Sequence, residues 1–274
     1  MDTTKGWDIP QRKTPDALNP EDPPPRIVLV TPVWNDSARL SQYAPALAAA
    51  LAASPLPIRW VIADDGSDGG ELEKLTALRT SLEGIFPHIE LLGFSKHRGK
   101  GAAIRGAWDS AKDAEWLAFV DADGSVPAKD ILSLISAAVS CGESMLGIRK
   151  ETTNTHIEES MMRGLLHRSF IFAVRMLLGI HCEDPQCGAK AIRGEDYRKI
   201  RADLREDGFA FDSELLAHLA SAGSTWREVP VNWTEKGDAK VRPLRDGAKM
   251  LVSLFRIRQR ISAQPPFPKT STSV

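Results

Sequence analysis

The chain has 274 residues, with 35 lysines and arginines against 36 aspartates and glutamates, a formal charge of −1 and 42% hydrophobic residues. This balance is typical of a globular protein and excludes a generally basic nucleic-acid-binding protein. The three cysteines form no CxxC pair, so we expect free thiols and a reducing compartment. Neither a leader sequence nor an apolar run of about 20 residues is visible, and we predict a cytoplasmic location.

Proline-rich segments lie at both ends of the chain. Residues 1–25 hold six of the 18 prolines and are predicted to form a disordered arm, and residues 262–274 are predicted to form a flexible tail. The body between them, 26–261, has a length that suits one α/β domain.

Short β-branched runs alternate with helical segments in the first half of this body. The predicted strands are Ile27–Val33, Ile58–Ala63, Ile89–Phe94 and Trp116–Val120. The predicted helices are Ser37–Ala53, Gly70–Leu82 and Lys100–Lys112. Continuous apolar strands that alternate with helices predict a parallel sheet covered on both faces. Ligands of such sheets bind at the carboxyl ends of the strands, so the polar residues there are the candidate functional residues.

Two carboxylates, Asp121 and Asp123, follow the fourth predicted strand. Their i, i+2 spacing places both side chains on one face while the extended backbone continues. Mg²⁺ or Mn²⁺ takes ligands from one or two carboxylates and from substrate phosphate oxygens, so the pair predicts a nucleotide-diphosphate site with a divalent cation. The alternative is that both aspartates only shape a turn before the helix near Pro127.

Two other strand ends also carry candidate groups. Asp64 and Asp65 are adjacent, so one is expected to face the crevice while the other braces the turn that follows, although a plain turn is the alternative for either. The Gly99-Lys100-Gly101 run opens a predicted helix and offers backbone N–H groups and an ammonium to an anion. It lacks the spacing of a P-loop, which argues against ATP hydrolysis.

Eight segments, in this order, resemble the glycosyltransferase family 2 enzymes that glycosylate polyprenyl phosphates, the group of the dolichyl-phosphate glucosyl- and mannosyltransferases. The segments begin at Pro32-Val33-Trp34-Asn35-Asp36 and continue with Asp64–Ser67, Gly99–Ala103, Asp121-Ala122-Asp123-Gly124, Gly147–Arg149, Asp184–Lys190, Phe209–Leu216 and Glu228–Trp233. Trp34, Asp36, Ile148 and Ala189 stand where tyrosine, glutamate, serine and phenylalanine are usual. The shorter Asp36 leaves the nucleobase open.

The resemblance implies a GT-A fold: a Rossmann-like nucleotide-sugar half with a mostly parallel central sheet flanked by helices (26–125), then an acceptor half (126–261). It implies a metal-dependent, inverting transferase that moves a hexose, glucose favoured, from a nucleotide-diphosphate sugar, UDP favoured, to polyprenyl phosphate. Asp121 and Asp123 are the implied ligands of Mg²⁺ or Mn²⁺. The implied nucleotide-sugar residues are Pro32, Trp34, Asn35, Asp36, Asp64, Asp65, Lys100, Asp121 and Ala122.

The acceptor determines which catalytic groups are needed. A phosphate monoester is already largely ionised at neutral pH, so a lipid phosphate requires cations that position it rather than a general base. Guanidinium groups suit this role. Asp212 is expected to position the acceptor or the sugar, to act as a base for an alcohol acceptor, or to cap its helix. The predicted acceptor residues are Arg149, Arg163, Arg168, Asp184 and Gln186, and the predicted catalytic residues are Asp123, Asp212 and Arg149.

Segments 160–180 and 243–261 mix apolar side chains with arginines and predict basic amphipathic helices. Such helices lie in anionic membrane interfaces, which places the protein peripherally on the cytoplasmic membrane face; the alternative is that both apolar faces pack on the domain. No nucleic-acid partner is expected, and a homodimer is left open. His97, His156 and His181 are isolated and are not expected to act.

Two other functions fit the same residues. One keeps the donor chemistry but transfers to a soluble or protein-bound acceptor. The other is an inactive nucleotide-sugar-binding or scaffold protein, against which the presence of both Asp121 and Asp123 argues.

Overall fold

The structure is a computed structural model that describes residues 26–158, 161–236 and 243–263. The predicted arm, 1–25, lies outside the described residues, as does the predicted tail after residue 263. Within the described ranges, all four predicted strands and all three predicted helices are present, with ends that differ by up to three residues.

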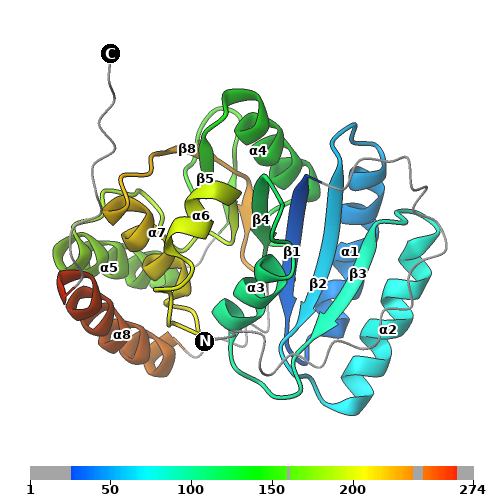
Figure 1. The fold of residues 1–274 in the computed structure, drawn as a ribbon, viewed down its shortest axis with the longest axis horizontal. Helices are drawn as coiled ribbons and strands as arrows, with labels where there is room; N and C mark the ends of the chain where they lie inside the picture. Colours follow the sequence, from blue (N-terminus) through cyan, green and yellow to red (C-terminus); the bar gives the residue numbers. More distant parts are fainter. Residues whose placement is uncertain (1–25, 159–160, 237–242, 264–274) are drawn as a thin grey trace.

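Seven of the described strands form one sheet in the order β3-β2-β1-β4-β7-β5-β8 (Figure 1). They are β1 Ile27–Val33, β2 Ile58–Asp64, β3 Ile89–Gly93, β4 Trp116–Val120, β5 Ser144–Ile148, β7 Ala189–Arg193 and β8 Trp226–Pro230. The pairings are parallel except that β7 runs antiparallel to both β4 and β5. The mostly parallel sheet predicted from the sequence is therefore confirmed. A separate parallel pair joins β6 Ile157–Glu158 to β9 Trp233–Thr234.

Helices cover both faces of the sheet. They are α1 Ser37–Ala52, α2 Gly69–Glu83, α3 Lys100–Asp109, α4 Ala128–Cys141, α5 Met161–Leu178, α6 Gly194–Ile200, α7 Phe211–Ser221 and α8 Pro243–Ala263. One buried core lies under α1, α2 and α4, and the other lies under α3 and α5 to α8. Alternate residues of β1 enter opposite cores, Ile27 and Leu29 one and Val28 and Val30 the other, because successive strand side chains point to opposite faces. Each fully buried side chain of this kind stabilises the fold by about 1.5–3 kcal/mol.

The strand order brings polar residues together at the carboxyl ends of β1 and β4. The chain proceeds from β1 to β2 and β3 on one side and then crosses to β4 on the other, so β1 and β4 form a topological switch point. Ligands of open α/β sheets bind outside the strand ends at such a point. Trp34, Asn35 and Asp36 follow β1, and Asp121 follows β4.

Candidate active site

The two turns that follow β1 and β2 are hydrogen-bonded to each other. The backbone N–H of Asn35 donates to Ser67 Oγ at 2.8 Å, and the N–H of Asp68 donates to Asn35 Oδ1 at 2.9 Å. Asn35 adopts a positive φ of 47°, which asparagine tolerates better than most residues. Asp64 accepts from both the backbone N–H and the hydroxyl of Ser67. The loops after β1 and β2 therefore form one connected unit.

Asp65 connects this unit to the loop before α3. Its carboxylate accepts from the backbone N–H of Arg98 at 2.9 Å and of Gly99 at 2.7 Å, and it pairs with His97 Nδ1 at 2.8 Å. Burial raises the pKa of Asp65, and these donors oppose the rise. Both Asp64 and Asp65 thus brace loops, whereas the sequence predicted this role for one of the two and expected the other to face the crevice.

The other predicted nucleotide-sugar residues lie in or after β1 and after β4. His97 stacks on Trp34 with ring centroids 3.9 Å apart and planes at 22°. Asp36 pairs through both carboxylate oxygens with Arg39 in the first turn of α1. Pro32 is half-buried within β1, and Ala122 is buried beside Asp121.

A chain of alternating charges connects the carboxyl end of β4 to β7 and to the starts of α3 and α7. Lys100 Nζ lies 2.8 Å from Asp121 Oδ1 and 3.3 Å from Asp212 Oδ2. Lys190 Nζ lies 2.7 Å from Asp212 Oδ1 and donates to the Cys187 carbonyl at 2.6 Å. The ring of Phe119 lies beneath both ammonium groups, 5.0 Å from that of Lys100 and 5.3 Å from that of Lys190, at cation–π range.

Two glycines bring this chain together. A Cβ atom on Gly101 would lie 2.4 Å from Cβ of Phe211, so only glycine lets the start of α3 pack on the start of α7, which places Lys100 beside Asp212. A Cβ atom on Gly188 would lie 1.9 Å from Asp121 Oδ2. The carboxylate of Asp121 therefore packs directly against the backbone of residue 188.

Charge pairing and burial act against each other on these groups. Burial opposes the charge of Lys100, but Asp121 and Asp212 outweigh it and raise the pKa of the ammonium. Burial alone would raise the pKa of Asp212, yet Lys100 and Lys190 bring it below its usual value. Burial raises the pKa of Asp121, and the negative charges of Asp123 and Asp212 raise it further. Lys100 lowers this pKa but does not offset the rise.

Asp121 and Asp123 fit a hard divalent cation as a two-carboxylate site. Both side chains are partly exposed at the end of β4, and Asp123 is oriented by the backbone N–H of Ser125, which donates to Oδ1 at 2.9 Å. Among the described residues, no group of three or more His, Cys, Asp or Glu side chains is arranged as a metal site. A cation held here therefore needs oxygen ligands from phosphate and water, as Mg²⁺ ordinarily does.

Three of the predicted acceptor residues, Arg149, Asp184 and Gln186, form a second cluster around the buried Asp184 carboxylate. Asp184 Oδ2 accepts from Arg149 Nε at 2.6 Å, and Oδ1 accepts from Arg149 Nη2 at 2.9 Å. His167 Nε2 lies 2.9 Å from the same Oδ1. Burial alone would raise the pKa of Asp184, but Arg149 and His167 hold it well below its usual range. Gln186 donates its backbone N–H to Asp184 and places its amide 3.8 Å from Met250 Sδ in α8.

Not every predicted acceptor residue joins this cluster. Arg168 is exposed on α5, and the side chain of Arg163 lies outside the described part of the chain. Asp212 and Glu214 point to different faces of α7, because residues two apart in a helix do not share a face. Glu214 accepts from the backbone N–H groups of Arg205 and Glu206 and pairs with Arg260, which attaches α8 to the domain.

The family model described as "Glycosyl transferase family 2" matches residues 28–201. The chain belongs to this family. This chain is 30% identical to a dolichyl-phosphate beta-glucosyltransferase of Trichomonas vaginalis over 243 residues. The match covers 83% of this chain and 69% of that protein. The enzymes of the same name from Dictyostelium discoideum and Saccharomyces cerevisiae are each 29% identical, and the matches cover 73% of this chain but only 62% and 64% of those proteins.

Solved structures match the fold. Glucosyl-3-phosphoglycerate synthase from Mycobacterium tuberculosis, in complex with Mn²⁺, uridine diphosphate and glucosyl-3-phosphoglycerate, superposes with a TM-score of 0.59 at 15% identity and covers 89% of this chain and 81% of that one. The GT-A fold expected from the sequence is confirmed.

The family 2 domain exposes apolar side chains on two adjacent helices, which we call the apolar face: Met161, Leu165, Phe172 and Met176 of α5, and Leu251, Val252 and Phe255 of α8. The four α5 residues fall within about 60° of one another on a helical wheel. Exposed Arg168, Arg175, Arg256 and Arg258 accompany them.

The opposite sides of both helices do pack on the domain, through Phe170, Val174, Leu254 and Ile257. Across the described helices, none is both long and apolar enough to serve as a membrane span.

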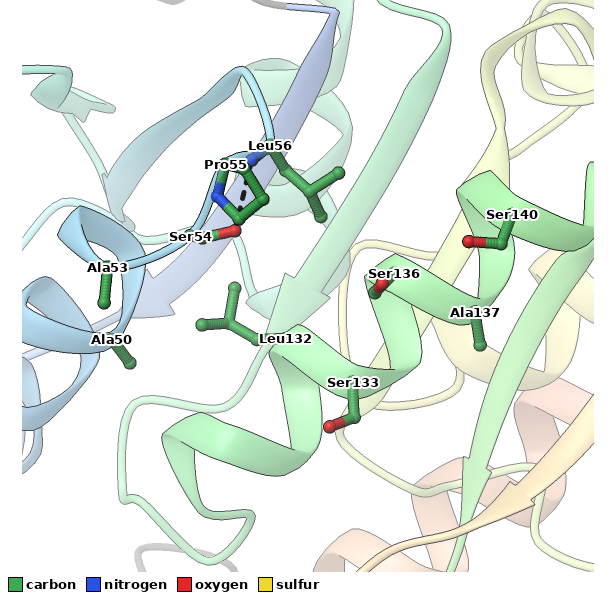
Figure 2. Close-up of a pocket in the computed structure, with 10 residues that line it drawn as sticks. All are labelled: Ala50, Ala53, Ser54, Pro55, Leu56, Leu132, Ser133, Ser136, Ala137 and Ser140. Carbon is green, nitrogen blue, oxygen red and sulfur yellow. Dashed lines mark hydrogen bonds between the residues drawn. The ribbon is translucent and has the colours of Figure 1, made fainter.

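A groove elsewhere on the surface is not part of this site. It lies between the end of α1 and the outer side of α4, next to the loop that enters β2, and its lining contains no charged side chain (Figure 2). That loop is at the amino end of β2, whereas the candidate site lies at the carboxyl ends.

From the sequence alone, His97 is not expected to act, and no role is assigned to His167 or Lys190. Each depends on a partner distant in sequence, at Asp65, Asp184 and Asp212. A usable signal existed for Lys190, since a lysine inside an otherwise apolar strand needs a buried partner. For His97, the usable signal was its position directly before the Arg98-Gly99-Lys100 run, which the sequence predicted to lie at the site.

Proposed function

We propose that the protein is a metal-dependent, inverting glycosyltransferase that moves a hexose, with glucose favoured, from a UDP-sugar to a polyprenyl phosphate. The observation that carries the proposal is the acidic pair Asp121 and Asp123 at the switch point of a family 2 domain, next to the buried ammonium of Lys100. The names of the similar dolichyl-phosphate beta-glucosyltransferases support the lipid-phosphate acceptor. Residues 26–125 hold the donor, and residues 126–261 the acceptor.

Donor cleavage needs stabilisation of the departing nucleotide diphosphate. Asp121 and Asp123 would hold Mg²⁺ or Mn²⁺, which when bound would supply positive charge that stabilises the departing diphosphate. Lys100, at the amino end of α3, adds an ammonium on the same side. Trp34, supported by the stacked His97, forms an aromatic platform suited to a nucleobase.

The acceptor phosphate needs positioning more than deprotonation. Its oxygens are already ionised at neutral pH, so in-line attack on the anomeric carbon requires no general base. Asp212 suits a positioning role, because both of its oxygens engage lysines and its pKa is lowered, which makes it a weak base. Arg149, oriented by Asp184, is the predicted phosphate ligand.

The apolar face supplies the route to a lipid acceptor. Both helices of this face contact the loop 184–188, which contains the predicted acceptor residues Asp184 and Gln186. Helix α5 contacts Asp184 through His167, and α8 contacts Gln186 through Met250. Apolar side chains flanked by arginines suit the cytoplasmic surface of an anionic membrane, where each basic residue contributes about 1 kcal/mol to attraction.

The test is a donor panel with a short-chain polyprenyl phosphate. UDP-glucose, other UDP-hexoses and GDP-mannose are incubated with Mn²⁺, with Mg²⁺ or with EDTA, and label extracted into organic solvent is counted. We expect metal-dependent formation of a lipid-linked hexose of inverted configuration, fastest with UDP-glucose.

Other outcomes separate the alternatives. Donor hydrolysis that polyprenyl phosphate does not accelerate would favour a soluble or protein-bound acceptor. No turnover together with no UDP binding would favour the inactive binding protein.

A further inference from the structure

We propose that Lys100 competes with the divalent cation for Asp121, so that the metal binds tightly only together with the nucleotide diphosphate. This inference rests on the proposed metal site at Asp121 and Asp123. It concerns the order and coupling of binding, which the proposed function leaves open.

The competition follows from the contact of Lys100. Its Nζ lies 2.8 Å from Asp121 Oδ1, and its side chain is only 12% exposed. The other oxygen of Asp121, Oδ2, packs against the backbone of Gly188 so closely that a Cβ atom there would lie 1.9 Å away. A cation that approaches Asp121 through the more open oxygen meets the ammonium already hydrogen-bonded to it.

The charge balance of the cluster points the same way. Asp121, Asp123 and Asp212 oppose Lys100 and Lys190, which gives a net charge of −1 for the five ionised groups. A divalent cation alone brings the cluster to +1 beside two ammoniums with side chains 12% and 0% exposed. Excess like charge in a poorly solvated site is costly. A nucleotide diphosphate restores negative charge and makes metal binding favourable.

Asp212 gives Lys100 an alternative partner. Its Oδ2 is 3.3 Å from Lys100 Nζ, while its Oδ1 is held by Lys190. When Asp121 turns to the metal, the ammonium of Lys100 keeps one carboxylate and gains the diphosphate oxygens. The exchange therefore leaves no buried charge without a counter-charge.

The experiment measures Mn²⁺ affinity by calorimetry and by the electron paramagnetic resonance signal of free Mn²⁺, with and without UDP. The full-length protein is compared with Lys100→Met, Lys100→Arg and Lys129→Met. Lys129 is exposed in the first turn of α4, so its replacement removes the same charge near the strand end without touching the acidic pair. Circular dichroism and thermal unfolding verify that each variant is folded.

We expect Lys100→Met to bind Mn²⁺ alone about tenfold more tightly than the unmodified protein, since one close ammonium has been removed. In the same variant UDP should strengthen Mn²⁺ binding far less than in the unmodified protein. Lys100→Arg keeps the charge and should retain weak binding of Mn²⁺ alone, and Lys129→Met should change it little.

Unchanged or weaker binding of Mn²⁺ alone by folded Lys100→Met overturns the inference, as does an equal gain in Lys129→Met. Asp123→Asn separates this failure from that of the proposed function. If Mn²⁺ binds the unmodified protein with UDP and Asp123→Asn abolishes that binding, the metal site stands and only the competition is refuted. If Mn²⁺ does not bind even with UDP, both are refuted.

Discussion

At the scale of single residues, Gly188 is required by contact rather than by backbone conformation. Its φ is not in the left-handed region, but its Cα faces the carboxylate of Asp121, and the backbone N–H of Asp121 donates to the Gly188 carbonyl at 3.0 Å. Any side chain at this position must displace a predicted metal ligand.

We therefore expect Gly188→Ala to lower metal-dependent turnover by about a hundredfold or more, because a displacement near 1 Å in a catalytic group has that scale of effect. Turnover and Mn²⁺ titration with UDP measure it. Gly84→Ala is the matched control, since a Cβ atom there meets nothing within 4 Å. Normal Mn²⁺ binding by Gly188→Ala would argue that Asp121 is not a ligand.

The buried cluster at Asp184 has a defined dependence on pH. Arg149 and His167 lower the pKa of Asp184 from its ordinary value of 3.8. Because the pKa is lower in the folded protein, the carboxylate contributes stability above the unfolded value, and that contribution falls as the pH drops below it.

Asp184→Asn should therefore reduce the free energy of unfolding by about 3–5 kcal/mol at neutral pH, the usual cost of breaking a buried ion pair. The difference from the unmodified protein should shrink below about pH 4, where Asp184 of the unfolded chain is protonated. Urea unfolding from pH 7 to pH 3 measures both effects. A difference that stays constant across this range would show that the carboxylate charge is not what stabilises the cluster.

At the scale of elements, the sequence predicted the first four strands and left the later ones unassigned. Strands such as Trp116–Val120 are continuous apolar runs, buried on both faces, and are recognisable without knowledge of their neighbours. Strand β7, Ala189–Arg193, contains Lys190, whose burial is possible only because Asp212 lies beside it in α7. That partner is 22 residues away in the chain, so its role becomes visible only in the folded protein.

The candidate site divides in the same way. The positions of Asp121, Lys100 and Trp34 followed from strand ends and from the family resemblance. The pairing of Arg149 with Asp184 and the hydrogen bonds of Asp65 to the loop before α3 are contacts between distant segments. The sequence predicted that one of Asp64 and Asp65 braces the turn, but it specified neither of these long-range contacts.

At the scale of the whole molecule, the apolar face lies on α5 and α8, whereas Asp121 and Asp123 follow β4, so substitutions on this face test lipid binding without altering the acidic pair. The variant Phe172→Glu with Met176→Glu places two carboxylates on a face whose side chains are 66% and 64% exposed. We expect its flotation with anionic vesicles to fall by roughly tenfold, because two apolar side chains are lost from the interface and negative charge is added.

In the same variant, donor hydrolysis in solution should stay unchanged, while transfer to polyprenyl phosphate in vesicles falls in parallel with flotation. Leu72→Glu is the control, as Leu72 is 40% exposed on α2, away from the apolar face. Flotation that survives the double change, or falls equally with Leu72→Glu, would refute the membrane role of this face.

The short loop 184–188 has a consequence for how the two substrates influence each other. At one end Asp184 is bonded to His167 of α5, and at the other end the Gly188 carbonyl is bonded to Asp121. If lipid binding to α5 and α8 favours one position of this loop, it changes the free energy of donor binding. Because coupling between two binding sites is reciprocal, the donor must then change the affinity for lipid by the same factor. UDP-sugar should therefore change how strongly the protein partitions onto a bilayer.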